Sequence, residues 1–228
     1  MAHLLTKSKY IRGLQCLRAL YYDVHHAKWA YYPPETLAKF RQGRDFEKTF
    51  KDTFPNGIDI SARLHSRMAS YPTLTAELLS QPGEVVLFEA GFIYNDVLVL
   101  ADVVHKQPDG SVIIYEVKNS DHVSDTFRND VSVQHYVISH ALPNIIPTDL
   151  FCSKLKLTNF FLLFHDEQGQ FQREDLMEFA KSMEESIEKK VALFKETILL
   201  PTAPAVEQSS HCDEPYACPY KRSCKWKG

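Results

Sequence analysis

The sequence predicts a mixed α/β fold in which helices cover a β-sheet. Three observations lead to this prediction: helical apolar stripes come first, a strongly apolar β-hairpin follows, and a helix and a further strand complete the pattern. Residues 97–104 are almost continuously apolar and β-branched, which is typical of a strand buried on both faces. The turn sequence Gln-Pro-Asp-Gly at residues 107–110 follows, and residues 111–118 form the returning strand.

The other elements are predicted from apolar spacing and from capping residues. Residues 8–22 carry an apolar helical stripe with Ser8 as the expected N-cap, and Pro33-Pro34 opens a second helix that ends near residue 50. Further helices are expected at residues 61–68, 74–79, 124–142 and 174–199, and further strands at residues 85–94 and 159–165.

Composition and length favour one globular unit with an appendage. The chain has 228 residues, 44% of them hydrophobic and 24% charged, with a net charge of −3. No stretch approaches about 18 consecutive apolar residues, and we see no signal peptide, so we expect a cytoplasmic protein without a membrane partner. We divide the chain into an N-terminal helical segment (1–30), a core (31–200), and a linker with a tail (201–228).

Basic side chains are concentrated at the two ends of the chain. If the ends meet, these residues form a patch suited to phosphate groups, whereas the alternative is two solvated charged ends. The candidates for phosphate contact are Arg12, Arg18, Lys221 and Arg222.

The hairpin places two acidic residues opposite each other. A three-residue loop would pair Gln107 with Ser111, and this register sets Asp102 directly opposite Glu116, with Lys118 on the same face. Two carboxylates in such positions lie roughly 5 Å apart at Cβ and repel each other. Burying them costs several kcal/mol unless a counter-charge is present, so the hairpin predicts a divalent metal site.

Glu89 interrupts another apolar strand. It is either a partner of the predicted metal ligands or an ordinary strand residue, and the sequence does not decide between the two.

Five cysteines in a chain without an export signal argue against a disulfide framework. Three of them lie in a tail too short to bury its own core, which favours a metal. Their wide spacing favours an iron–sulfur cluster over zinc. If zinc is bound instead, His211 would be a spare ligand. Cys152 is expected to be a plain thiol. The expected 4Fe-4S ligands are Cys16, Cys212, Cys218 and Cys224.

The order of these features resembles the PD-(D/E)xK nuclease superfamily, in which an Asp ends one strand and Glu-x-Lys lies on the next. Here these are Asp102 and Glu116-Val117-Lys118. Upstream, the run from Gly43 to Glu47 resembles the first motif of the superfamily, and downstream, the run from Asp130 to Tyr136 resembles the Gln-centred RecB-type motif.

One cysteine before the core and three after it resemble the iron–sulfur clamp of RecB-like and AddB-like nucleases, including the CRISPR-associated exonucleases. The segments around Cys16 and from Cys212 to Cys224 look closest to an uncharacterised RecB-like family. Glu47, where the CRISPR-associated members usually have His, and a first tail spacing longer than Cys-x-x-Cys both weaken a CRISPR-adaptation role.

The resemblance implies a restriction-endonuclease-like αβββαβ core with a mixed sheet and ends clamped by the cluster. Mg²⁺ or Mn²⁺ would be held by Asp102, Glu116, the Val117 carbonyl and Glu47. Lys118 would orient the attacking water. The remaining site residues are expected to be Gln134, which fixes Lys118 or the substrate, and Tyr136 or His135, which contact a phosphate or a base.

We therefore expect a metal-dependent DNA nuclease with a structural 4Fe-4S cluster that acts on single strands or ends. Two alternatives remain open: a non-catalytic nucleic-acid-binding module of the same fold, and a zinc-stapled interaction protein. The sequence holds no Gly-x-x-x-x-Gly-Lys-Ser/Thr motif, so an ATP-driven helicase would be a separate partner.

Overall fold

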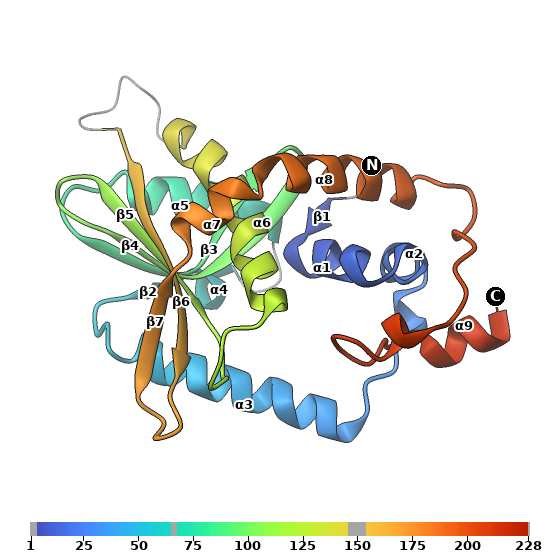
Figure 1. Cartoon of the computed structure of the whole chain (residues 1–228). Helices are drawn as coiled ribbons and strands as arrows, with labels where there is room; N and C mark the ends of the chain where they lie inside the picture. Colours follow the sequence, from blue (N-terminus) through green and yellow to red (C-terminus); the bar gives the residue numbers. More distant parts are fainter. Residues whose placement is uncertain (1–3, 65–67, 146–153, 228) are drawn as a thin grey trace.

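The computed structural model describes residues 4–64, 68–145 and 154–227, and within these residues the chain is an α/β protein (Figure 1). A mixed sheet of seven described strands is flanked by helices, with the strand order β2-β3-β4-β5-β6-β7 and with β1 paired to β4. The strands are β1 (Leu5–Thr6), β2 (Ile58–Asp59), β3 (Val85–Tyr94), β4 (Val97–Lys106), β5 (Ser111–Val117), β6 (Lys156–His165) and β7 (Phe171–Asp175).

The centre of the sheet is an antiparallel meander of β3, β4 and β5. Asn95 and Asp96 both have positive φ angles, 48° and 57°, as a tight two-residue turn between β3 and β4 requires. β6 pairs parallel to β5 and β7 antiparallel to β6, while the short β1 and β2 each add a parallel pair to the meander. The predicted α/β class and the three central strands are therefore confirmed.

Helices cover both faces of the sheet. They are α1 (Lys7–Gln15), α2 (Leu17–His25), α3 (Pro34–Lys51), α4 (Ile60–Leu64), α5 (Tyr71–Leu79), α6 (Asp125–Ala141), α7 (Met177–Ser182), α8 (Glu184–Ile198) and α9 (Lys221–Lys227). The main core includes residues of α1, α2, α5, α6 and α8. On the opposite face, Phe50 of α3 packs in a smaller core with Phe88, Tyr115 and Leu163.

The predicted helix over residues 8–22 is wrong, because it is two helices that meet at Cys16. Cys16 is extended, with φ −164° and ψ 123°, and it ends α1 and begins α2. Its N–H donates to the Arg12 carbonyl while its own carbonyl accepts from the Leu20 N–H, so the break leaves neither group unpaired. Thr6, rather than Ser8, caps α1 by accepting a hydrogen bond from the Lys9 N–H.

The predicted helix over residues 174–199 is also wrong. Its first residues belong to the edge strand β7, which pairs with β6 between Phe161↔Asp175 and His165↔Phe171. Backbone pairing outweighs the local helical pattern here. Asp175 then ends the strand, because its Oδ1 accepts the Met177 N–H at 3.0 Å as α7 begins.

The N-terminal segment is part of the main core, to which it contributes Leu5, Tyr10 and Leu20. Among the helices of the described residues, none combines the length and the apolar character that crossing a membrane would need.

Candidate metal centre and its buried ion-pair network

The hairpin between β4 and β5 forms in the predicted register. Gln107 N–H donates to the Ser111 carbonyl at 2.8 Å, and Gly110 has a φ of 88°. The pairs run from Lys106↔Val112 to Val103↔Tyr115, and the next step places Asp102 opposite Glu116. At that step the Asp102 carboxylate itself accepts the Val117 N–H at 2.8 Å, so a side chain replaces a backbone acceptor where the ladder ends.

Asp102 belongs to a cluster of three carboxylates with Glu47 and Glu89. One oxygen of each lies within 4.8 Å of the others, and all three side chains are partly exposed. The residues come from three elements, α3, β3 and β4. The pairs Phe88↔Val103 and Ala90↔Ala101 place Glu89 opposite Asp102. Glu89, Asp102 and Glu116 therefore occupy facing positions on the three adjacent strands β3, β4 and β5.

Glu89 has a strained backbone. Its φ is 55°, which a non-glycine residue inside a strand rarely adopts, and it forms no ladder pair although both of its neighbours do. Such strain persists only where the surrounding structure imposes it, and it concentrates at functional sites. The kink thus sets Glu89 apart from an ordinary strand residue.

Lys51 lies between two of these carboxylates. Its ammonium group forms ion pairs with Glu47 and with Glu89, the latter at 2.8 Å, and its side chain is only 14% exposed. Lys51 thus pairs with two of the three carboxylates, and Asp102 has no ion pair of its own among the described residues. Burial raises the pKa of Glu89, and the charge of Lys51 lowers it. The pKa remains above its usual value because the Glu47 carboxylate adds to the effect of burial.

Burial and then the charge of Glu116 raise the pKa of Asp102 well above its usual range; the charge of Lys7 opposes this shift, and Glu47 and Glu89 add to it by smaller amounts. Without a cation, the Asp102 and Glu89 carboxyls therefore hold their protons more readily than free carboxyls do. A divalent cation with oxygen ligands is the counter-charge that such a group of carboxylates accepts.

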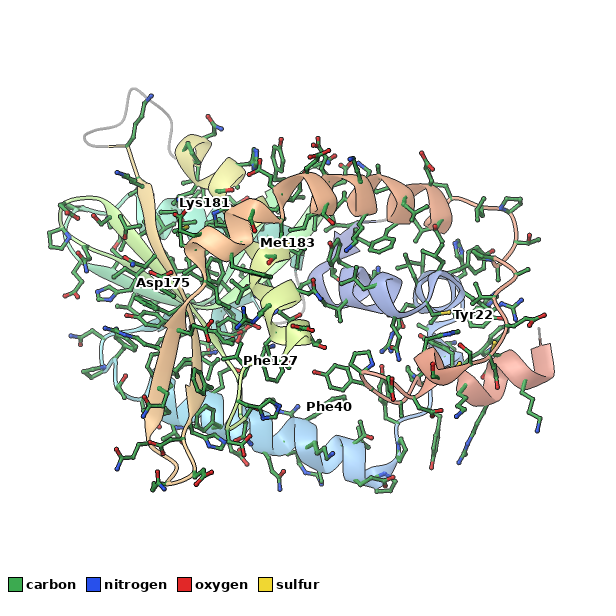
Figure 2. The ribbon with its side chains drawn as sticks, viewed as in Figure 1. Tyr22, Phe40, Phe127, Asp175, Lys181 and Met183 are labelled. Carbon is green, nitrogen blue, oxygen red and sulfur yellow. The ribbon has the colours of Figure 1, made fainter. Side chains whose placement is uncertain are left out.

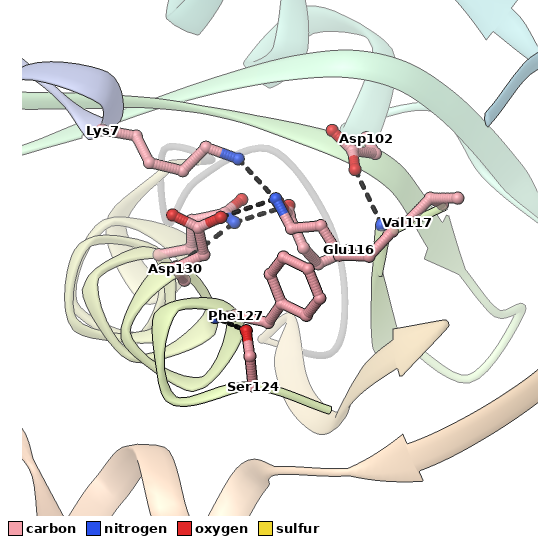
Figure 3. A network of polar contacts seen from close by, with 9 residues as sticks. Lys7, Asp102, Glu116, Val117, Ser124, Phe127 and Asp130 are labelled. Atoms are coloured by element: carbon pink, nitrogen blue, oxygen red, sulfur yellow. Dashed lines mark hydrogen bonds and ion pairs between the residues drawn. The ribbon is translucent and has the colours of Figure 1, made fainter. Parts of the chain in front are cut away.

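Glu116 is surrounded by positive and amide donors, as Figure 3 shows. Its Oε1 pairs with Lys7 and with Lys118, both at 2.8 Å, and its Oε2 accepts from Gln134 at 2.6 Å. Lys118 also pairs with Asp130 at 2.5 Å. Because the Glu116 side chain is only 1% exposed, these partners are needed to keep its charge inside the protein.

The charges of this network stabilise one another. Burial opposes ionisation of Glu116, but the charges of Lys118 and Lys7 outweigh it, so the pKa of Glu116 is lowered. Burial likewise disfavours the Lys118 ammonium, but Glu116 and Asp130 outweigh burial and raise the pKa of Lys118. Both groups therefore remain charged at neutral pH.

The structure thus separates the predicted ligands into two neighbouring groups. Asp102 and Glu47 lie together with Glu89, whereas the Glu116 carboxylate is directed to Lys7, Lys118 and Gln134 (Figure 3). The N–H of Val117 serves Asp102, and a metal contact of the Val117 carbonyl stays a prediction.

Three residues of α6 differ from their predicted roles. Gln134 is fully buried and donates to Glu116 rather than contacting Lys118, and its contact with a substrate stays a prediction. His135 and Tyr136, expected to touch a phosphate or a base, are 3% and 2% exposed, so neither has a surface to offer. Burial also lowers the pKa of His135 to about 4. Helical periodicity placed these residues on α6 but not on its buried side.

The predicted basic patch is smaller than expected. Arg12 lies 3.8 Å from Asp23 and donates to Gln15, while Arg18 donates to the Pro204 carbonyl at 2.7 Å, so both serve internal contacts. The other two remain on the surface. Lys221 pairs with Asp213 at 2.7 Å, and the Arg222 guanidinium lies 4.1 Å from the centre of the Tyr31 ring.

The two ends of the chain do meet, and the four predicted cysteine ligands, Cys16, Cys212, Cys218 and Cys224, line one cavity. His211, Arg18 and Tyr22 also line it, and Arg18 donates to the Cys224 sulfur at 3.4 Å. All four cysteines are free thiols. A cavity lined by four thiols from two distant segments fits a cluster with four thiolate ligands. Cys152 lies outside the described residues.

No family model matches the chain, and no curated protein matches it. A solved structure described as the crystal structure of SSO0001 covers 88% of this chain and 87% of its own, with 11% identity and a TM-score of 0.43.

Sequence reasoning missed several residues of this region. Glu89 had a signal, because it interrupts an apolar strand, but its role was left open. Lys51 shows only an ordinary spacing of four residues from Glu47. Lys7 had no signal, because it lies 109 residues from Glu116 and only the fold brings the two together.

We expect Glu116→Gln to lower the free energy of unfolding at pH 7 by about 3–5 kcal/mol, because it leaves two ammonium groups short of a partner. The lowered pKa of Glu116 gives stability that is present above the unfolded pKa of about 4.3 and is lost as the pH falls towards the folded value. The difference between variant and wild type should therefore shrink below about pH 4. Urea unfolding across the pH range measures this, with Glu178→Gln, the same substitution at an exposed position, as control. A constant difference would contradict it.

Proposed function

We propose that this protein is a metal-dependent nuclease that hydrolyses phosphodiester bonds of DNA, on single strands or at strand ends. The observation that carries the proposal is the convergence of Glu47, Glu89 and Asp102 within 4.8 Å beside the Lys118–Glu116 pair. Carboxylates that share a confined site need a hard cation, and an ammonium next to them suits a reaction that develops negative charge. A cytoplasmic location and a separate helicase partner belong to the same proposal.

Each residue then has a defined part. Mg²⁺ or Mn²⁺ would be held by Asp102, Glu47 and Glu89, and when bound it would neutralise the scissile phosphate and activate a water. Lys118 would stabilise the charge that develops on the phosphate. Glu116 and Asp130 position the Lys118 ammonium, which both contact directly. Glu116 would join the metal only if it left one of its present partners.

A structural 4Fe-4S cluster held by Cys16, Cys212, Cys218 and Cys224 is the second part of the proposal. The shared cavity supports it. Gln15, next to Cys16, donates to the carbonyls of His211 and Tyr216 at 2.9 and 2.6 Å, so the two segments are also joined by hydrogen bonds. Zinc is the alternative, with His211 next to Cys212 as a further ligand.

One observation favours a non-catalytic nucleic-acid-binding module instead. Lys51 already pairs with Glu47 and Glu89, and a lysine that remained there would occupy the place of a metal. Metal binding distinguishes the two proposals directly.

We expect Mn²⁺ to raise the melting temperature of the wild type, with a stabilisation of about 2.7 kcal/mol at a hundredfold excess over Kd. Glu89→Gln and Asp102→Asn should lose most of this gain, because each removes a charged ligand. Lys51→Met should enlarge it, because the ammonium no longer competes for Glu47 and Glu89. The control is Glu178→Gln, an exposed carboxylate on α7 that is 85% exposed. Equal gains in all variants would exclude a metal at this cluster.

We expect the wild type to cleave end-labelled DNA in Mg²⁺ or Mn²⁺, and Asp102→Asn and Lys118→Ala each to reduce the rate by at least about 100-fold. The amide introduced by Asp102→Asn keeps an acceptor for the Val117 N–H, so this variant separates loss of activity from loss of fold. Lys181→Ala is the matched control for Lys118, since Lys181 is an exposed lysine on α7.

Equal activity in all proteins would point to a contaminant. Absence of cleavage in wild type that retains its cluster would leave the binding module as the better proposal.

We expect protein purified without oxygen to contain about four irons per chain. Cys16→Ala and Cys218→Ala should lose the iron, because each removes a thiolate ligand, whereas Cys152→Ala should retain it. Metal analysis by mass spectrometry measures this. One zinc and no iron would support the zinc alternative instead.

A further inference from the structure

Four aromatic side chains are exposed on α3, on the segment just before it and on the cysteine tail. Their exposed fractions are 44% for Tyr31, 36% for Tyr32, 47% for Phe40 and 51% for Tyr216. Burying large aromatic rings is strongly favourable, so several exposed rings in one region indicate a surface that another molecule covers. We call these four residues the aromatic strip.

Two members of the strip contact each other, and a third is bonded to the tail. The Tyr31 N–H donates to the Pro219 carbonyl at 3.0 Å, which ties the start of the strip to the tail. Arg222 lies over the Tyr31 ring, and the Tyr32 and Phe40 rings form an edge-to-face pair with centroids 5.7 Å apart. One pair thus sets a guanidinium beside an exposed ring, and the other connects the segment before α3 with the helix itself.

α3 leads from the strip to the carboxylate cluster. Phe40 and Glu47 are seven residues apart and share one face of the helix, about 10 Å apart along its axis. Arg44 lies between them on the same face and is exposed. In the view of Figure 2, Phe40 lies on the side of the long α3 ribbon that is turned towards the tail.

Tyr216 lies on the side of the tail, and its loop is held in place. The Gln15 amide donates to the backbone carbonyls of His211, Glu214 and Tyr216 at 2.9, 3.2 and 2.6 Å. The Tyr216 side chain contacts Thr126 of α6 and lies close enough to Asp130 and Lys118 for their charges to act on it; burial is the main cause of its raised pKa. The tail thus brings an aromatic ring towards Lys118.

We infer that the aromatic strip binds single-stranded nucleic acid and directs it towards the cluster of Glu47, Glu89 and Asp102. Bases stack on the exposed rings, and phosphates meet Arg222 and Arg44. The delivery of the nucleic acid to the carboxylate cluster rests on the proposed function, whereas its binding to the aromatic strip does not.

The chemistry of the strip favours a single strand over other partners. Exposed rings beside arginines provide stacking and phosphate contacts without reading the base sequence. A duplex cannot use the rings, because its bases already stack on each other. An uncharged apolar protein segment would not need Arg44 and Arg222.

The test is the binding of a fluorescein-labelled oligothymidylate to the metal-loaded protein, followed by anisotropy with Ca²⁺ in place of Mg²⁺. Loss of one stacking ring costs about tenfold in affinity. We expect Phe40→Ala and Tyr216→Ala to weaken binding by about this factor, and Tyr216→Phe to bind like wild type because the ring remains. Tyr94→Ala is the matched control, an aromatic that is also 36% exposed but stacks on His140 away from the strip.

Equal affinity of wild type and the two alanine variants would overturn the inference, as would a preference for duplex or an absence of binding. Cleavage assays on the same proteins keep the two proposals apart. Cleavage that does not depend on Phe40 or Tyr216 would support the proposed nuclease activity and contradict a role for the aromatic strip. Binding that depends on both rings, without any cleavage, would support the aromatic strip as a binding surface and contradict the proposed nuclease activity.

Discussion

The buried charge of Glu116 is the constraint on which the rest of this region depends. A carboxylate in the middle of a sheet is tolerated only if donors surround it, and here they come from three places: α1, the end of β5 and α6. Each donor fixes the position of the element that carries it. The network therefore determines how the N-terminal helix and α6 sit against the sheet.

The same constraint leaves the neighbouring carboxylates without enough counter-charge. Lys7 and Lys118 are directed to Glu116, and among the described residues only Lys51 forms ion pairs with members of the cluster, Glu47 and Glu89. In one group the charges of Lys7 and Lys118 balance those of Glu116 and Asp130, whereas in the other the three carboxyl groups are partly exposed and the pKa values of Asp102 and Glu89 are raised. The balanced ion-pair network and the candidate metal site are thus neighbours, since Asp102 and Glu116 face each other on adjacent strands.

Sequence reasoning succeeded where the information was local. The hairpin register followed from the turn residues, and the facing positions of Asp102 and Glu116 followed from that register. It failed where contacts between distant segments decide. The break at Cys16, the strand Phe171–Asp175 and the burial of His135 and Tyr136 all depend on partners elsewhere in the chain, and Lys7 is invisible without the fold. Glu89 lies between these cases, because its unusual place in a strand was readable but its kinked backbone was not.

The short helix α1 joins the two ends of this arrangement. It begins with Lys7, which reaches Glu116, and it ends at Gln15, beside Cys16. Each residue of a helix advances the chain by about 1.5 Å and turns it by about 100°. Inserting or deleting a single residue between Lys7 and Cys16 would rotate one of them away from its partners. Homologous chains should therefore keep a constant count of nine residues in α1.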